Sequence, residues 1–109
     1  MQLIKAIVRP NKVDEVKEAI EKVGVTGMTV TQVRGHGQQK GHTAIYRGKE
    51  YAVSLLPKMQ IETVVADGDV ETTIRALVGA ARTGEIGDGR VYVTPVMQSY
   101  KIRTGERES

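Results

Sequence analysis

The segment LIKAIVRPNKVDEVKEAIEKV, Leu3 to Val23, decides the fold because its hydrophobic period changes partway along. Its first part, Leu3 to Val8, is a short apolar run that ends near a proline, which is typical of a central strand. From Asn11 to Val23, apolar residues recur every three or four positions and charged residues fill the other face. The segment therefore predicts a strand and then an amphipathic helix, with Asn11 as its N-cap and Gly24 as its stop.

The rest of the chain repeats this alternation of strand and helix. Further strands are predicted at Met28–Arg34, Lys58–Ala66 and Val91–Val96, and a second helix over Val70–Ala81 with Asp67 or Asp69 as its cap. The order β-α-β-loop-β-α-β is typical of an α+β, ferredoxin-like βαββαβ sandwich. We expect one domain over residues 1–109, with an open sheet face that other subunits bury.

Three segments fall outside this regular pattern. Gly35 to Leu56 has four glycines and no sustained period, which predicts a long functional loop, over about residues 36–55, without regular structure. Arg82 to Arg90 is a second glycine-rich loop. In the C-terminal segment, residues 98–109, we expect a short strand at Ser99–Arg103 and then a loose tail.

Composition excludes several classes of protein. The 109 residues include no cysteine, which excludes a disulfide scaffold, a thiol nucleophile and a cysteine metal site. No apolar run approaches the roughly 20 residues of a membrane-spanning helix. We therefore expect a cytoplasmic protein without direct membrane insertion. The two histidines, His36 and His42, are more typical of solvated loop residues than of metal ligands.

The positive charge is concentrated in one part of the chain. Between Arg34 and Lys58 there are five basic residues and one acid, a net charge of +4, whereas the remainder carries −1. This pattern argues against a nucleic-acid coat and favours a local anion or partner site. The glycines and basic residues of the Arg82–Arg90 loop fit either a phosphate cradle or an ordinary helix-to-strand turn.

Several motifs together resemble the PII nitrogen-regulatory signal proteins. They are GMTVTQVRG (Gly27–Gly35), QKGHTAIYRGKEY (Gln39–Tyr51), ARTGEIGDGRVYV (Ala81–Val93) and KIRTGER (Lys101–Arg107). The resemblance covers nearly the whole chain. It implies a homotrimer in which ATP and ADP compete for clefts between subunits, while the long loop engages a target.

The resemblance also implies a role for individual residues. The adenine and ribose region would be lined by Ile7, Met28, Thr29, Gly35 and Val64, with Glu62 nearby. The phosphates would be approached by Gly37, Gln38, Gly87, Asp88, Gly89, Arg90, Lys101 and Arg103. Gln39 would help to bind Mg²⁺ together with the ATP phosphates and 2-oxoglutarate, and Lys58 would pair with a 2-oxoglutarate carboxylate.

Partners and modification follow from the long loop. Arg47 matches the residue that contacts an ammonium transporter in transporter-binding members, and a nitrogen-metabolism enzyme is the alternative target. Tyr51 matches a tyrosine that some branches modify, whereas Lys49 excludes the phosphorylation found at that position in another branch. Gln38 replaces the usual arginine, which predicts weaker triphosphate binding or altered discrimination between ATP and ADP.

The sequence thus favours a regulatory binding protein rather than an enzyme. It would report nitrogen, carbon and energy status by binding ATP or ADP and, with Mg-ATP, 2-oxoglutarate. Two alternatives stay open: a PII-like sensor for another transport or metabolic system, and a small acylphosphatase-like hydrolase. The absence of a Ser-His-Asp or carboxylate-dyad pattern speaks against the hydrolase, although slow incidental ATP hydrolysis is compatible with the sensor.

Overall fold

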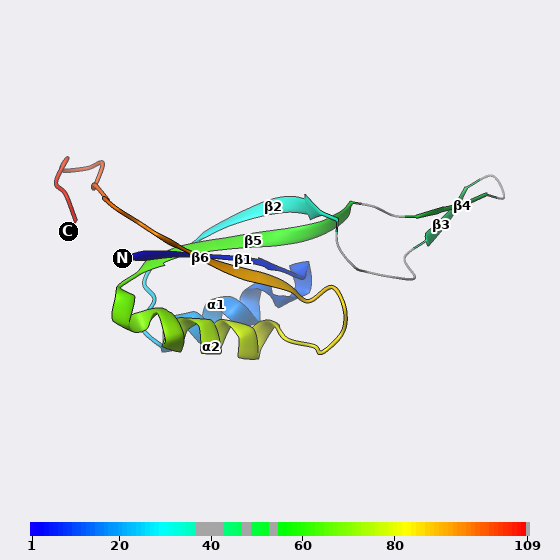
Figure 1. Cartoon of the computed structure of the whole chain (residues 1–109), viewed down its shortest axis with the longest axis horizontal. Coiled ribbons are helices and arrows are strands. Elements are labelled where there is room, and N and C mark those ends of the chain that lie inside the picture. The colour runs from blue at the N-terminus through cyan, green and yellow to red at the C-terminus, as the bar shows by residue number, and fades with distance from the viewer. Residues whose placement is uncertain (37–42, 47–48, 53–54, 109) are drawn as a thin grey trace.

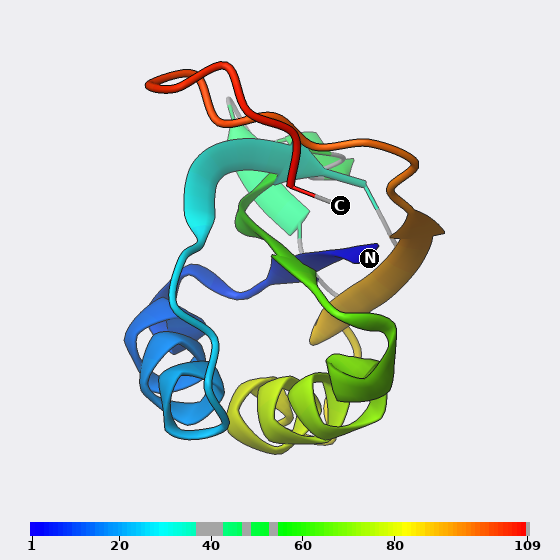
Figure 2. The ribbon, with the colours of Figure 1, turned by 90° about the vertical axis from the view of Figure 1, so that its left-hand side faces the viewer.

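The chain forms two layers, a four-stranded antiparallel sheet and two helices that cover one of its faces (Figures 1 and 2). The computed structural model describes residues 1–36, 43–46, 49–52 and 55–108. The sheet strands are β1 (Gln2–Val8), β2 (Thr29–Gly35), β5 (Leu56–Val65) and β6 (Gly89–Pro95), in the order β2-β5-β1-β6. This order confirms the predicted ferredoxin-like architecture, and it places β6 at an edge.

The first helix begins later than predicted, whereas the second spans the predicted residues. The helical elements are η1 (Pro10–Lys12), α1 (Val13–Lys22), η2 (Asp67–Asp69) and α2 (Val70–Ala81). Asn11 lies inside the 3₁₀ turn η1, which Pro10 starts, so the prediction of an Asn11 cap was wrong. Asp69 does occupy the N-cap position of α2, but its side chain makes no capping hydrogen bond.

Two more strands lie in the segment predicted to lack regular structure. β3 (Thr43–Tyr46) pairs with β4 (Lys49–Ala52) in a separate antiparallel sheet, so that prediction was wrong in part. The segment contains threonine, isoleucine and tyrosine, which are residues that favour strands. In Figure 1 this small sheet lies beyond the end of the main sheet at which the loop between α2 and β6 also lies.

The core is aliphatic and lies between the sheet and the helices. It consists of Ile4, Ala6, Val8, Val16, Ile20, Ile61, Val65, Leu77 and Ala81. In β1 the buried residues alternate with less buried ones, because successive side chains of a strand point to opposite faces. Lys5 and Ile7 therefore belong to the open face, together with Gln60 and Glu62, their partners across β5.

The C-terminal segment folds back on itself. Tyr100 forms an isolated bridge with Arg107, and the backbone amide of Glu108 donates to the carbonyl of Ser99 at 2.7 Å. The predicted strand at Ser99–Arg103 and the loose tail after it were therefore wrong, because the two halves of the segment bond to each other. None of the helices in the described part of the chain has the length and apolar character needed to cross a membrane.

Candidate anion-binding site

A cavity of about 400 Å³ opens on the face of the sheet that the helices leave uncovered. It is lined by Ile7, Val33, Arg34, Gly35, His36, Lys58, Gln60, Gly89, Arg90 and Tyr92. Arg34, Lys58 and Arg90 are basic residues, and none of the described lining residues is a carboxylate. Such a lining attracts anions, because cations in a concave site reinforce one another's field.

The strand register explains why residues far apart in sequence meet at this cavity. Ile7 of β1 pairs with Gln60 of β5 on one side and with Arg90 of β6 on the other. Val33 of β2 pairs with Lys58, which lies two residues from Gln60 along β5. Since paired residues of neighbouring strands point to the same face, these side chains lie side by side.

Gly89 brings two strands into unusually close contact at the edge of this cavity. Its φ is +108°, and a Cβ at this position would lie 1.7 Å from the carbonyl oxygen of Ile7. Any other L-residue would therefore overlap the backbone of β1 and also be strained in φ. Glycine is therefore required here by the fold.

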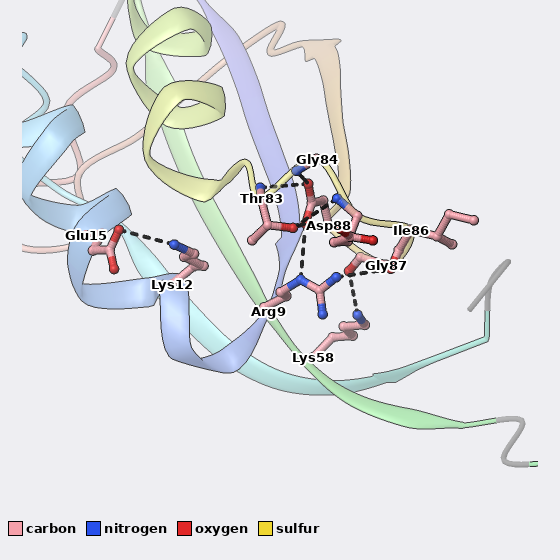
Figure 3. Close-up of polar contacts among 10 residues, drawn as sticks. Arg9, Lys12, Glu15, Lys58, Thr83, Gly84, Ile86, Gly87 and Asp88 are labelled. Carbon is pink, nitrogen blue, oxygen red and sulfur yellow. Dashed lines mark hydrogen bonds and ion pairs between the residues drawn. The ribbon is translucent and has the colours of Figure 1, made fainter. Parts of the chain in front are cut away.

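Lys58 projects from β5 toward the loop that precedes β6. Only 8% of the residue is exposed, and its Nζ donates a hydrogen bond to the carbonyl of Gly87 at 2.7 Å (Figure 3). Burial, and next the positive charge of Arg9, lower the pKa of Lys58, while Asp88 acts in the opposite direction. The ammonium has three N–H donors, so the bond to Gly87 leaves capacity for an anion.

Asp88 organises the loop between α2 and β6. Its Oδ2 accepts hydrogen bonds from the backbone amides of Thr83 at 2.8 Å and Gly84 at 2.9 Å. Its Oδ1 accepts from the hydroxyl of Thr83 and from Nε of Arg9, the latter at 3.1 Å. The bonds from Thr83, above all, hold the pKa of Asp88 well below its ordinary value, so the carboxylate is ionised.

Comparison with known proteins identifies the family to which this chain belongs. A family model described as Nitrogen regulatory protein P-II matches residues 1–106. The chain belongs to the P-II family. It is 55% identical over 107 residues to the Nitrogen regulatory protein P-II of Azospirillum brasilense, covering 98% of this chain and 96% of the relative. It is 54% identical to that of Cereibacter sphaeroides (97% and 95% covered) and 52% identical to that of Klebsiella oxytoca (99% and 96% covered).

Membership of the P-II family confirms the resemblance predicted from the sequence. P-II proteins are regulatory signal proteins of nitrogen metabolism, and the family is trimeric. The fold is that expected of P-II, with two helices on one sheet face and the other face open.

The residues expected to bind the P-II ligands fall into two groups in a single chain. Ile7, Gly35, Lys58, Gly89 and Arg90 line the basic cavity, and Gly87 and Asp88 adjoin it. Toward the opposite end of the sheet are Met28, Thr29 and Val64, and the C-terminal segment beyond holds Lys101 and Arg103. Glu62 lies between the two groups, because its side chain accepts a hydrogen bond from Gln60 of the cavity lining. Thr29 is six residues from Gly35 along β2, which corresponds to about 20 Å. One chain therefore does not bring all of these residues together.

Side chains in the second group differ in their contacts. Met28 packs against the core, whereas Val64 is exposed on the open face. Nζ of Lys101 lies 3.9 Å from Oε1 of Glu108 within the C-terminal segment.

Several residues named in the sequence analysis lie outside the described residues. They are Gly37, Gln38, Gln39 and Arg47, which the P-II resemblance implicates, and the histidine His42. Tyr51 belongs to β4.

Sequence reasoning missed several residues of the site and its surroundings. They are Arg9, Val33, Arg34, Gln60, Thr83 and Tyr92. One signal was available for Arg9: it directly follows Val8, the last residue of the first strand, and the glycine-rich loop leads into the neighbouring strand. Once β1 and β6 are paired antiparallel, with Val8 opposite Gly89, Arg9 must lie beside that loop.

Proposed function

We propose that this P-II protein is a cytoplasmic homotrimer that reports nitrogen, carbon and energy status. It binds ATP or ADP competitively in clefts between subunits, and it binds 2-oxoglutarate when Mg-ATP is present. The basic cavity supports this proposal, because Lys58 and Arg90 line it from the open face of the sheet and none of the described lining residues is a carboxylate. A polyphosphate and a dicarboxylate are the kinds of ligand that such a lining favours.

The phosphates would lie against the start of β6. Arg90 offers a planar set of N–H donors that suits phosphate oxygens, and Gly89 lets the ligand approach the backbone closely. Lys58 would pair with a carboxylate of 2-oxoglutarate through the donors that the Gly87 carbonyl does not use. The residues present at this end of the sheet thus fit two anionic ligands side by side.

The other half of the site would come from a second copy. Thr29 and Val64 lie toward the far end of the sheet from the basic cavity, as the register requires. In a trimer, the end of one chain that holds Thr29 and Val64 can face the basic cavity of its neighbour, so that adenine and phosphate residues from both chains meet in one cleft. The about 20 Å between the two groups is then no obstacle, since each cleft uses one group from each chain.

Magnesium would have few ligands from the protein. The described lining residues include no carboxylate, and Mg²⁺ prefers oxygen ligands. Phosphate and 2-oxoglutarate oxygens together with the side-chain amide of Gln39 would supply them. When bound, the ion offsets the negative charge that the two ligands bring together.

The signal would pass through the segment of about residues 36–55. Ligands that favour different conformations of this segment shift its population, and a target then binds or dissociates. An ammonium transporter contacted by Arg47 is the proposed target, a nitrogen-metabolism enzyme is the alternative, and Tyr51 is the proposed modification site. The protein acts by binding and not as an enzyme.

Isothermal titration calorimetry tests the proposal. We expect heat from ATP and from ADP, competition between them, and heat from 2-oxoglutarate only with Mg-ATP. Replacing Arg90 by Ala should weaken ATP binding about tenfold or more. Replacing Arg75 by Ala should not, because Arg75 is exposed on α2 beside Glu71. Absence of heat from either nucleotide would contradict the proposal, and nucleotide binding without a 2-oxoglutarate effect would favour a P-II-like sensor for another system.

A further inference from the structure

The carboxylate of Asp88 lies near the basic cavity but on the helix side of the sheet. Asp88 lines a second cavity of about 230 Å³, which α2 and the strands β1 and β6 enclose on the helix side of the sheet. It is not among the residues that line the basic cavity, whereas Gly89 and Arg90, which follow it, line both. Asp88 thus directly precedes two residues of the basic cavity without lining that cavity itself.

The bonds of Asp88 are all made within the chain. Both carboxylate oxygens accept two hydrogen bonds each, from the backbone amides of Thr83 and Gly84, the hydroxyl of Thr83, and Nε of Arg9 (Figure 3). An ionised carboxylate has no proton to donate, so it cannot hydrogen-bond to a phosphate oxygen. Direct contact of this side chain with an anionic ligand is therefore unfavourable.

The same cluster fixes the backbone next to the cavity. Arg9 uses Nη2 to donate to the carbonyl of Ile86 at 3.0 Å, in addition to its bond with Asp88. Lys58 donates to the next carbonyl along the chain, that of Gly87. Two cations thus hold consecutive peptide groups, and Asp88 lies where its negative charge offsets their mutual repulsion.

The geometry points to Asp88 as a positioning residue of the anion site, which acts through Arg9 and Thr83 to hold residues 83–88 in the shape that binds phosphate. Arg9, Thr83 and Asp88 are called the Asp88 clamp below. The identity of the anion as a nucleotide phosphate rests on the proposed function. The clamp itself rests on contacts that need no ligand.

Asp88→Asn separates this role from a simple charge effect, because the two predict opposite signs. If Asp88 were only a negative charge near the site, its removal would strengthen anion binding. If it is a clamp, Asn supplies one acceptor oxygen in place of two and releases the loop. We expect faster amide hydrogen exchange over residues 84–89 of the ligand-free protein. We also expect ATP and ADP to bind about tenfold more weakly, equivalent to about 1.4 kcal/mol.

Asp67→Asn is the matched control. Asp67 is also ionised and paired with a cation, but it lies at the other end of the sheet. This variant should leave both the exchange of residues 84–89 and nucleotide affinity unchanged. An Asp88→Asn variant that binds ATP as well as or better than the wild type would overturn the proposal.

A second pair of variants covers the case in which Asp88→Asn does not fold. Thr83→Val removes the hydroxyl that bonds to Asp88, and Thr83→Ser retains it. We expect faster amide exchange of residues 84–89 and weaker ATP binding in Thr83→Val. Thr83→Ser should restore wild-type exchange and wild-type ATP affinity. Identical behaviour of the two variants would contradict the clamp. If the wild type binds no nucleotide, the proposed function fails. Exchange of residues 84–89 in Asp88→Asn against Asp67→Asn then decides the clamp alone, faster exchange supporting it and equal exchange overturning it.

Discussion

The two ends of the sheet each carry an ionised aspartate paired with a cation, but they use it differently. At one end, Asp88 accepts four hydrogen bonds, and 24% of its side chain is exposed. At the other end, Asp67 accepts from the terminal ammonium of Met1 at 2.9 Å and from Nε2 of Gln2 at 3.0 Å, and 73% of its side chain is exposed.

The comparison shows what turns an ion pair into part of a site. Asp67 joins the start of β1 to the turn before α2, in a solvated position where such pairs contribute little. Asp88 bonds to two backbone amides of its own loop as well as to Arg9, so it determines the course of the chain beside a basic cavity. Backbone donors and partial burial, more than the ion pair itself, separate the two ends.

The largest expected difference is in the free energy of unfolding, when a glycine at each end of the sheet is replaced by alanine. Gly89→Ala places a Cβ against the carbonyl of Ile7 and should destabilise the fold by about 3 kcal/mol or more. Gly68→Ala, beside Asp67, meets no atom within 4 Å and should change the free energy of unfolding by less than about 0.5 kcal/mol. Urea unfolding at a fixed protein concentration measures both. Similar unfolding midpoints would show that β1 and β6 separate more easily than their contact indicates.

Removing the buried lysine should give the next largest effect. Lys58→Met keeps an apolar stem but loses the ammonium, so it should weaken 2-oxoglutarate binding in the presence of Mg-ATP by about tenfold or more. ADP binding should weaken less than 2-oxoglutarate binding, because ADP would be held mainly by Arg90 and lose only the indirect support of the Gly87 contact. Lys22→Met, at the exposed end of α1, serves as the control. Calorimetry decides, and a full 2-oxoglutarate response in Lys58→Met would show that another group binds the carboxylate.

The smallest expected effect is on how steeply the stability of the fold falls in acid when Asp88 or Asp67 is replaced. The native pKa values of Asp88 and Asp67 are both below the ordinary 3.8, so each aspartate stabilises the fold fully above that value. This stabilisation is lost as the pH falls through the lower native value. Urea midpoints measured from about pH 6 to about pH 2 should therefore fall less steeply in Asp88→Asn than in the wild type, and Asp67→Asn should show the same change more weakly. Equal slopes for all three proteins would contradict the assigned hydrogen bonds.

The order of elements could be predicted from the sequence because it follows local periodicity. The change of period after Val8 and the apolar spacing from Val70 to Ala81 each depend on neighbouring residues only. The start of α1 was mispredicted because Pro10 favours a 3₁₀ turn, which then includes Asn11. Local patterns give the type of each element more securely than its ends.

The site was predictable only in part, since its contacts join distant segments. The glycine-rich loop was identified from a local motif, and Lys58 from the resemblance of the chain to the P-II family. The bond between Arg9 and Asp88 joins residues 79 positions apart and depends on the pairing of β1 with β6. The sequence likewise does not show that Asp88 turns to the helix side, because side-chain direction in a loop follows from the folded backbone.

The close contact of Gly89 with Ile7 makes the floor of the basic cavity stiff. β1 is hydrogen-bonded on both sides, by β5 and by β6, and no gap remains between it and Gly89 into which either strand could move. A ligand that enters the cavity can therefore displace the lysine and arginine side chains more easily than the strands beneath them. Binding would therefore be accommodated by side chains at the mouth of the cavity, while the backbone of β1 and β6 keeps its place.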